Sequence, residues 1–297
     1  MNPFTPFRLA LAVLALSAQL HVSAAPLPEE GKVGGFIIGC QAYTFRLFTL
    51  FEAIEKTEQA GGSVIELSGK QKLSKEQPDV IFNHDASDDA IAKVKAKLAQ
   101  HHVRAVNYGV VNAKDEAEWR RVFEFAKKMG LYAITTEDVE HIDIIEKLVK
   151  EFDIRAGYHE HAKRMKKGPD GRQAPDESYK VWDPAFVRDL VKNRDPRIGA
   201  CADTGHWQTS GIKPVDALRI LEGRIISVHL KERAVLGEHG PDIIYGTGVS
   251  DTAGVLDELK RQKFSGHISI EYENHWEDNV ADVRQCIDFV RKHGAAK

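Results

Sequence analysis

One pattern recurs eight times along the chain: a short apolar run ends in polar residues and is followed by an amphipathic helical segment. The apolar runs are continuous rather than alternating, as in buried parallel strands. In the helical segments, apolar residues recur at helical spacing, as in Val122, Phe125, Ala126 and Met129. Alternating strands and helices make a parallel sheet, and eight units close a barrel. The sequence therefore predicts an α/β fold, a single (β/α)8 TIM barrel.

The units can be placed along the chain. The expected strands are residues 35–45, 63–68, 103–111, 132–138, 154–161, 197–207, 224–232 and 266–273. The expected helices are residues 47–61, 88–101, 115–130, 139–153, 184–195, 213–223, 251–266 and 279–294. An open doubly wound sheet is the alternative, but it predicts a Gly-rich phosphate loop after the first strand. The run CQAYTFRLF at that place is no such loop.

The first 25 residues have the pattern of a secretory signal peptide. Arg8 precedes an apolar segment too short to span a bilayer, and small residues follow. Cleavage after Ala24 or Ala25 would leave residues 26–297 as one barrel domain, periplasmic or secreted. The alternative is a buried N-terminal helix. No later stretch approaches ~18 unbroken apolar residues, so no membrane contact is expected after cleavage.

Charge and cysteine content exclude some classes of partner and of fold. The chain has 41 Lys and Arg against 44 Asp and Glu, a formal net charge of −3, and removal of the leader makes it more negative. A mildly acidic protein does not attract nucleic acid through its overall field. Cys40, Cys201 and Cys286 lack CxxC spacing and are expected to be small buried apolar residues.

Polar residues gather where the expected strands end, which is where active sites of such barrels form. They are Tyr43, Arg46, Glu66, Asn107, Tyr108, Glu137, Asp138, His159, Glu160, His161, Asp203, His206, His229, Lys231, Glu232, Glu271 and Glu273. Many carboxylates around one mouth repel one another unless a cation compensates them. Carboxylates mixed with imidazoles suit Mn²⁺, Fe²⁺, Co²⁺ or Zn²⁺. We therefore expect one divalent metal ion.

Several of these residues also have an ordinary structural interpretation. A strand-end Asp is most often a helix cap, but Asp203 precedes TGHW rather than an obvious helix. His206 is either a core histidine or a site residue. His229, inside IISVHL, and Glu271, closing HISI, would be costly to bury unpaired, which favours a ligand role. Glu137 is a weaker ligand candidate, since a Glu at a helix start commonly partners the helix dipole.

The two-residue period of a strand separates neighbouring side chains. His229 and Lys231 share a direction, so Lys231 is expected at the barrel mouth rather than on the surface. Glu160 and Glu232 are expected to face helices or loops.

Two long polar loops, residues 162–180 and 233–250, follow strands and so lie on the active-site face. The first is either a tolerated surface insertion or a cover for the site, its own or a neighbour's in a homodimer. The glycines and the lone Tyr245 of the second favour a lid.

These motifs resemble those of the xylose isomerase-like barrels, also called the sugar phosphate isomerase/epimerase superfamily. ACADTGHWQTSG, VHLKE, YGTG and GHISIEYE occur in the family's order and spacing, and the resemblance covers about residues 36–290. It implies one divalent ion, preferably Mn²⁺ with Zn²⁺, Co²⁺, Fe²⁺ or Mg²⁺ also open. Asp203, His229 and Glu271 match three of the family's four metal ligands. His206 matches a histidine that contacts substrate.

The fifth strand departs from the family pattern. Most members end this strand on a Glu that is both ligand and base, whereas His159 of YHEH stands there in this chain. A subgroup with HNH at this place, which includes 3-keto-glycoside lyases, is more similar. In that subgroup an acid after the fourth strand completes the site. The metal ligands implied are therefore Glu137, Asp203, His229 and Glu271.

Such a site would remove a proton α to a carbonyl. The metal would polarise the carbonyl, and Lys231 would help to stabilise the enediolate. The expected base is His159 or His161, because imidazole titrates near neutrality, and Glu271 is expected to take part in catalysis. The expected substrate contacts are Tyr43, Arg46, Asn107, His206 and Glu273.

The sequence contains no phosphate-binding Gly loop and no Arg cluster, and the protein is expected to be exported. Both features favour a non-phosphorylated sugar or keto-sugar as the substrate. An isomerase or epimerase is the main expectation, and a 3-keto-glycoside lyase that works by β-elimination is the alternative. An abasic-site endonuclease is less favoured, since it would need more ligands and a basic track. A non-catalytic sugar-binding module would show no proton exchange at a substrate carbon.

Overall fold

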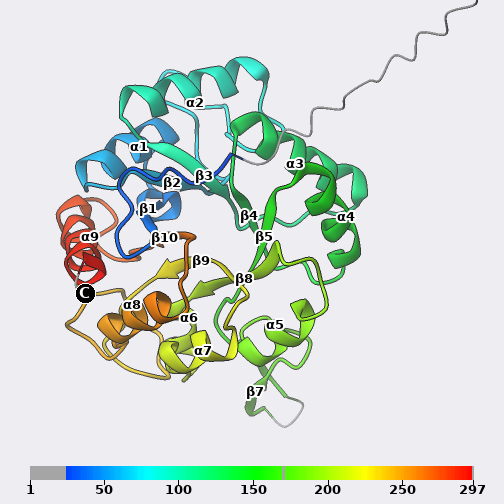
Figure 1. Cartoon of the computed structure of the whole chain (residues 1–297), viewed down its shortest axis with the longest axis vertical. Helices are drawn as coiled ribbons and strands as arrows, with labels where there is room; N and C mark the ends of the chain where they lie inside the picture. The colour runs from blue at the N-terminus through cyan, green and yellow to red at the C-terminus, as the bar shows by residue number, and fades with distance from the viewer. Residues whose placement is uncertain (1–24, 169–170, 296–297) are drawn as a thin grey trace, which may run out of the picture.

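A closed parallel barrel lies at the centre of the computed structural model, which describes residues 25–168 and 171–295 (Figure 1). Its strands are β1 (Ile37–Gln41), β2 (Val64–Leu67), β3 (Arg104–Tyr108), β4 (Ala133–Thr136), β5 (Arg155–His159), β8 (Ile198–Asp203), β9 (Ile225–Leu230) and β10 (His267–Ile270). They follow one another around the barrel in chain order, and β1 pairs with β10 to close it. The predicted single (β/α)8 TIM barrel is confirmed.

Helices form an outer ring around these strands (Figure 1). They are α1 (Leu50–Gln59), α2 (Asp88–Gln100), α3 (Glu116–Met129), α4 (Ile142–Phe152), α5 (Pro184–Val191), α6 (Thr204–Thr209), α7 (Pro214–Ile220), α8 (Thr252–Arg261) and α9 (Val280–Ala295). Their ends follow local capping chemistry. Thr49 and Glu52 form a capping box at the start of α1. Gly130, in the left-handed region at φ 75°, ends α3.

The barrel interior carries a polar layer below its mouth. Glu66, Asn107, His229 and His267 are fully buried there, each from a different strand or strand position. Buried polar groups are costly unless they are paired. This layer is therefore maintained by hydrogen bonds inside the barrel, while the apolar core lies between the strands and the helices.

Every barrel strand ends one or more residues before its predicted end, and at two of these ends a helix follows directly. The expected strand 197–207 stops at Asp203, because α6 begins at Thr204. The expected first strand stops at Gln41 and continues as a short 3₁₀ helix, η1 (Ala42–Phe45). Loop 162–180 contains a small antiparallel hairpin of β6 (Met165–Lys167) and β7 (Gln173–Pro175).

Loop 233–250 is fastened to the barrel. Tyr245 is buried, and its hydroxyl donates to the carbonyl of Leu230. The carboxylate of Glu232 accepts hydrogen bonds from the Ser250 amide at 2.7 Å and the Gly246 amide at 3.0 Å. Tyr245, which the prediction of a lid used, thus anchors the loop, and the lid stays a prediction, while Glu232 faces this loop as expected.

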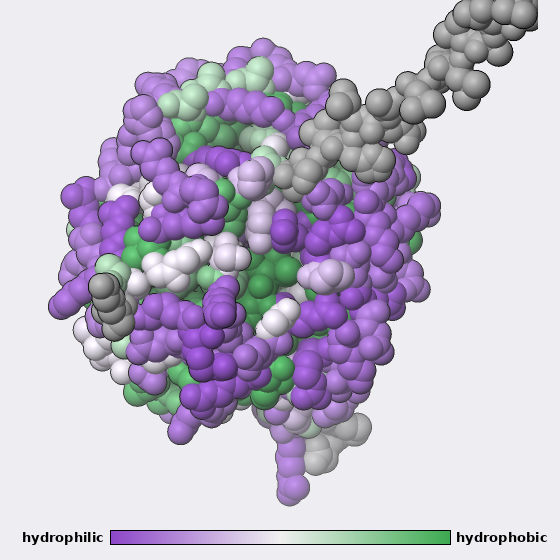
Figure 2. All heavy atoms as spheres, in the orientation of Figure 1, coloured by the Kyte–Doolittle hydropathy of each residue, from purple (hydrophilic) through white to green (hydrophobic). Residues whose placement is uncertain are grey.

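Hydrophilic residues cover most of the molecular face seen in Figure 2. Within residues 25–168 and 171–295, no helix is long and apolar enough to cross a membrane. Cys40, Cys201 and Cys286 are buried and unpaired, as expected. The signal peptide predicted for residues 1–25 lies outside the described residues apart from Ala25, and the domain limits 26–297 stay a prediction.

Candidate metal and substrate site

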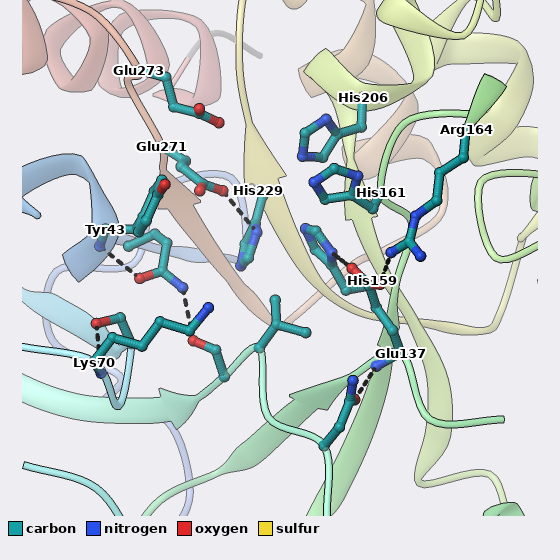
Figure 3. A pocket seen from close by; sticks show the side chains of 15 residues that line it. Tyr43, Lys70, Glu137, His159, His161, Arg164, His206, His229, Glu271 and Glu273 are labelled. Carbon is teal, nitrogen blue, oxygen red and sulfur yellow. Dashed lines mark hydrogen bonds and ion pairs between the residues drawn. The ribbon is translucent and has the colours of Figure 1, made fainter. Parts of the chain in front are cut away.

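Four side chains from consecutive strand ends converge at the barrel mouth, and Figure 3 shows three of them, His159, His229 and Glu271. The four are His159 at the end of β5, Asp203 at the end of β8, His229 in β9 and Glu271 directly after β10. One ligand atom of each lies within 4.8 Å of those of the other three, and all four residues are buried. The parallel order of these strands produces the cluster, since their carboxyl ends meet at one rim.

The cluster fits a divalent metal ion for two reasons: the chemical type of its donor atoms, and the lack of hydrogen-bond partners for three of them among the described residues. Asp203 Oδ2, His229 Nδ1 and Glu271 Oε2 are buried, and none has a hydrogen-bond partner among the described residues. Native proteins rarely leave buried polar atoms without partners. Two imidazole nitrogens and two carboxylates form a donor set for Mn²⁺, Fe²⁺, Co²⁺ or Zn²⁺. A cation placed between these atoms would satisfy all of them.

His159 enters the cluster in place of Glu137. His159 Nε2 lies 3.4 Å from Asp203 Oδ2, while its Nδ1 lies 3.0 Å from Glu137 Oε1. Burial opposes a positive charge, but the hydrogen bonds to Asp203 and Glu137 raise the pKa of His159 to about 10. Both ring nitrogens are therefore engaged. The structure corrects two expectations: Glu137 lies outside the cluster as a partner of His159, and His159 has no free nitrogen to act as a base.

Asp203 performs two roles at once. Its Oδ1 accepts the backbone N–H of His206 at 2.8 Å and caps α6, while its Oδ2 points into the cluster. Burial alone would raise the pKa of Asp203, but the charge of Lys231 and the contacts with His159 and His229 hold it well below its usual range. The helix-cap interpretation, which the sequence disfavoured, holds together with the site role.

Lys231 is fully buried beside the cluster. Its Nζ lies 3.4 Å from Asp203 Oδ2, 3.4 Å from Glu271 Oε2 and 2.5 Å from Glu273 Oε1. Burial opposes the charge, but these three carboxylates raise the pKa of Lys231 well above its usual value. The side chain is thus a permanent cation at the mouth, as its phase with His229 predicted.

His161 and His206 form a pair of neighbouring imidazoles over the cluster (Figure 3), with ring centroids 4.0 Å apart and ring planes tilted by 33°. The Nδ1 atoms of both are buried without a hydrogen-bond partner among the described residues. Burial lowers the pKa of His161 and lowers that of His206 well below its usual value, which favours the neutral form of each ring.

The cluster forms the floor of a pocket of about 360 Å³. Its walls are Gln41, Tyr43, Ser68, Lys70, Gly109, Val110, Asn112, Glu137, His159, His161, Arg164, His206, His229, Glu271 and Glu273. Lys70 and Arg164 enter from opposite sides (Figure 3). The expected substrate contacts Tyr43, His206 and Glu273 line this pocket together with three members of the cluster, His159, His229 and Glu271.

Two expected substrate contacts lie elsewhere. Arg46 is exposed outside the pocket, where its guanidinium lies 3.9 Å from the centre of the Trp276 ring and donates to the Tyr43 hydroxyl at 2.7 Å. Asn107 is buried inside the barrel, and its Nδ2 donates to Thr135 Oγ1 at 2.7 Å. The two errors have different causes: β1 ends at Gln41, well before Arg46, whereas Asn107 lies within β3, level with the start of β4 at Ala133, and so below the mouth.

Sequence reasoning missed the role of four residues. Glu66 hydrogen-bonds His229 Nε2 at 2.9 Å, and its position inside the apolar run VIEL was a usable signal. Lys70 and Arg164 line the pocket, and the Tyr179 hydroxyl donates to Glu137 Oε2 at 3.0 Å. These three lie in loops, where no periodicity indicates the direction of a side chain.

Comparison of the sequence with models of protein families assigns the chain to one family. The model of the xylose isomerase-like TIM barrels matches residues 54–293, and the chain belongs to that family. No curated protein matches the sequence.

Solved structures with the same fold include proteins named as sugar epimerases. A protein from Parabacteroides distasonis is 31% identical, with 87% of this chain and 99% of that chain covered and a TM-score of 0.68. D-allulose 3-epimerase from Methylomonas sp. is 16% identical, with 87% and 98% covered and a TM-score of 0.62. D-psicose 3-epimerase from Clostridium cellulolyticum H10, solved with D-tagatose, is 13% identical, with 88% and 100% covered and a TM-score of 0.64.

Proposed function

We propose that this protein is a divalent-metal-dependent enzyme that removes a proton α to the carbonyl of a non-phosphorylated sugar or keto-sugar, as sugar isomerases and epimerases do. The observation that carries the proposal is that a cluster suited to a metal lies beside the imidazoles of His161 and His206, both of which line the same pocket. Sugar 3-epimerases share the fold, and their names support the substrate class.

His159, Asp203, His229 and Glu271 would hold the ion. When bound there, it would supply a Lewis acid beside the substrate carbonyl. Mn²⁺ is our first choice, and the donor set also suits Zn²⁺, Co²⁺ and Fe²⁺.

Proton transfer falls to the imidazoles above the cluster. His161 lines the pocket and makes no ion pair with a carboxylate in the structure, so its ring can take a substrate proton. His206, whose ring lies beside it, reaches the same volume and can return a proton to another atom of the substrate. The fixed charge of Lys231 stabilises the negative charge that develops when the proton leaves.

The test is proton exchange in D₂O with Mn²⁺ and a panel of sugars and keto-sugars. Deuterium should enter at the α carbon with the wild-type protein. His161→Gln should lower the exchange rate about 100-fold or more with unchanged metal content. Asp203→Asn should lose both exchange and metal. Wild-type-like exchange in His161→Gln would exclude this base, and no exchange or turnover across the panel would exclude the enzyme.

A second candidate, a 3-keto-glycoside lyase, is favoured by a neighbouring cleft. This cleft of about 540 Å³ shares Asn112 and Glu137 with the site pocket and has Tyr179 and Phe186 in its wall. It could receive an aglycone. In the elimination, the α proton goes to the base, the C–O bond breaks, and the leaving oxygen keeps the electron pair and takes up a proton. Release of free aglycone from a 3-keto-glycoside separates this candidate from an isomerase.

We also propose that the protein is exported from the cytoplasm. Phosphorylated sugars are mainly intracellular, so export favours a non-phosphorylated substrate. The support is the leader pattern of residues 1–25. Cell fractionation and N-terminal sequencing should find a mature chain that begins at Ala25 or Pro26 outside the cytoplasm. A homodimer and the lack of nucleic-acid binding stay predictions, for light scattering and a gel-shift assay.

A further inference from the structure

A carboxylate inside the barrel holds the far side of the His229 ring. Glu66 Oε2 lies 2.9 Å from His229 Nε2, and the two side chains are 0% and 1% exposed. Glu66 belongs to β2 and His229 to β9, so this hydrogen bond crosses the barrel interior.

Glu66 is itself held in place from a third strand. Ser269 Oγ of β10 donates to Glu66 Oε2 at 3.2 Å, and His267 Nε2 lies 3.6 Å away. Asn107 Nδ2 lies 3.3 Å from the same His267 nitrogen. The carboxylate is therefore part of the polar layer below the mouth and has no alternative direction to turn.

The hydrogen bond decides which nitrogen of His229 can bind a metal. An ionised carboxylate only accepts hydrogen bonds, so the hydrogen must sit on His229 Nε2. The Nδ1 lone pair then faces Asp203 Oδ2 at 3.8 Å and Glu271 Oε2 at 3.0 Å. We propose that Glu66 is a positioning residue that fixes His229 as an Nδ1 ligand and strengthens it as a donor.

This inference rests on the proposed metal centre. Carboxylate partners of metal-bound histidines fix the ring orientation and raise its basicity, and their loss typically costs 10–100-fold in affinity. Glu137 holds His159 in the same way, but it lines the open pocket, where water can replace it. Glu66 has no such replacement, so we expect its loss to have the larger effect.

The chain offers a matched control for Glu66. Glu160 is an equally buried glutamate one residue from a metal ligand, and neither of its oxygens has a hydrogen-bond partner among the described residues. Glu66→Gln and Glu160→Gln each replace one carboxylate oxygen of a fully buried side chain with an amide nitrogen. Only Glu66 contacts one of the proposed ligand histidines, His229.

Titration of the metal-free full-length proteins with Co²⁺ alone measures the effect. Glu66→Gln should bind Co²⁺ 10–100-fold more weakly than wild type, and Glu160→Gln should bind with wild-type affinity. In the NMR spectrum of the Co²⁺ protein, each ligand imidazole N–H should give a strongly shifted signal that disappears in D₂O. The signal of His229 should move in Glu66→Gln and stay in Glu160→Gln.

The outcomes separate the two proposals. Wild type that binds no Co²⁺ overturns the metal centre and this inference together. Equal affinity and an unmoved N–H signal in Glu66→Gln overturn the inference alone. If Glu66→Gln does not fold, Ser269→Ala removes only a donor to Glu66, and a severalfold loss of Co²⁺ affinity supports the inference, while no loss overturns it.

Discussion

His159 Nδ1 lies 3.0 Å from Glu137 Oε1, and this contact ties a ligand histidine to the wall of the substrate pocket. The other oxygen of Glu137 accepts the Tyr179 hydroxyl at 3.0 Å. Glu137→Gln should weaken metal binding about tenfold, because a neutral amide orients and polarises His159 less than a carboxylate does. Calorimetric titration with Mn²⁺ measures this.

Tyr179→Phe is the matched control for that change. It removes the contact on Oε2 and leaves the bond between Glu137 and His159 intact, so metal affinity should stay within about twofold of wild type. Equal weakening in both variants would show that the loop, rather than the histidine, depends on Glu137.

The two oxygens of Asp203 can be tested separately. Asp203→Asn keeps an acceptor for the N–H of His206, since Asn caps helices as well as Asp, but it removes the anionic ligand. Asp203→Ala removes both. Both variants should lose the metal, and the alanine variant should be less stable than the asparagine variant by about 1 kcal/mol. Urea unfolding in EDTA measures the difference, and equal stabilities would contradict the capping role.

Metal binding should stabilise the folded chain by mass action. At a free metal concentration of 100 times the Kd, the free energy of unfolding should rise by about 2.7 kcal/mol, and EDTA should remove the gain. Thermal unfolding of wild type and of His229→Asn with and without Mn²⁺ measures this. A rise in Tm of equal size in the variant would mean that the ion binds elsewhere.

Gly205 is required by the packing of Lys231. A Cβ at position 205 would lie 2.6 Å from both Cβ and Cδ of Lys231, whose stem is fully buried. Gly205→Ala should therefore lower the stability by about 1–3 kcal/mol and reduce kcat by displacing the ammonium group. Gly240→Ala, where a Cβ would meet no atom within 4 Å, is the control and should change neither.

An ion-pair network on α4 should make stability depend on pH. Hydrogen bonds from Lys150 and Arg194 lower the pKa of Glu146 to about 2, against the effect of burial. A depressed folded-state pKa gives stability that is present above the ordinary glutamate pKa of 4.5 and is lost as the pH falls toward 2. Glu146→Gln should cost about 1 kcal/mol at pH 7, a small value because the network is partly exposed to solvent.

Urea unfolding of the two proteins from pH 7 to pH 2 measures that cost. The difference between Glu146→Gln and wild type should disappear toward pH 2. The exposed Glu124 of α3 supplies a control, and Glu124→Gln should match wild type throughout. A difference for Glu146→Gln that is constant with pH would show that shape rather than charge matters.

The barrel could be predicted because every one of its units repeats the same physical pattern. Asp203, His229 and Glu271 could be predicted as well, since each puts a polar group at the end of a buried apolar run, where only pairing offsets the cost of burial. The same reasoning applied to VIEL would have found Glu66.

Other parts of the site depend on contacts that no local pattern encodes. Whether Glu137 or His159 reaches the cluster is set by the heights at which β4 and β5 end relative to one another. Asn107 and Arg46 were misplaced because one or two residues decide whether a side chain lies inside the barrel, in the pocket or outside it. Tyr179 lies in a loop, and a loop has no regular residue periodicity from which the direction of a side chain can be predicted.

The hydrogen bond between Glu66 and His229 also has a consequence for the order in which the molecule is assembled. The ring closes only when β10 pairs with both β1 and β9, and β10 is the last strand of the chain to emerge from the ribosome. A nascent chain without β10 lacks Glu271, and a partly unfolded chain has the ligand residues without the geometry that selects Nδ1. Metal acquisition should thus follow completion of the barrel, and a trapped folding intermediate should bind the ion weakly.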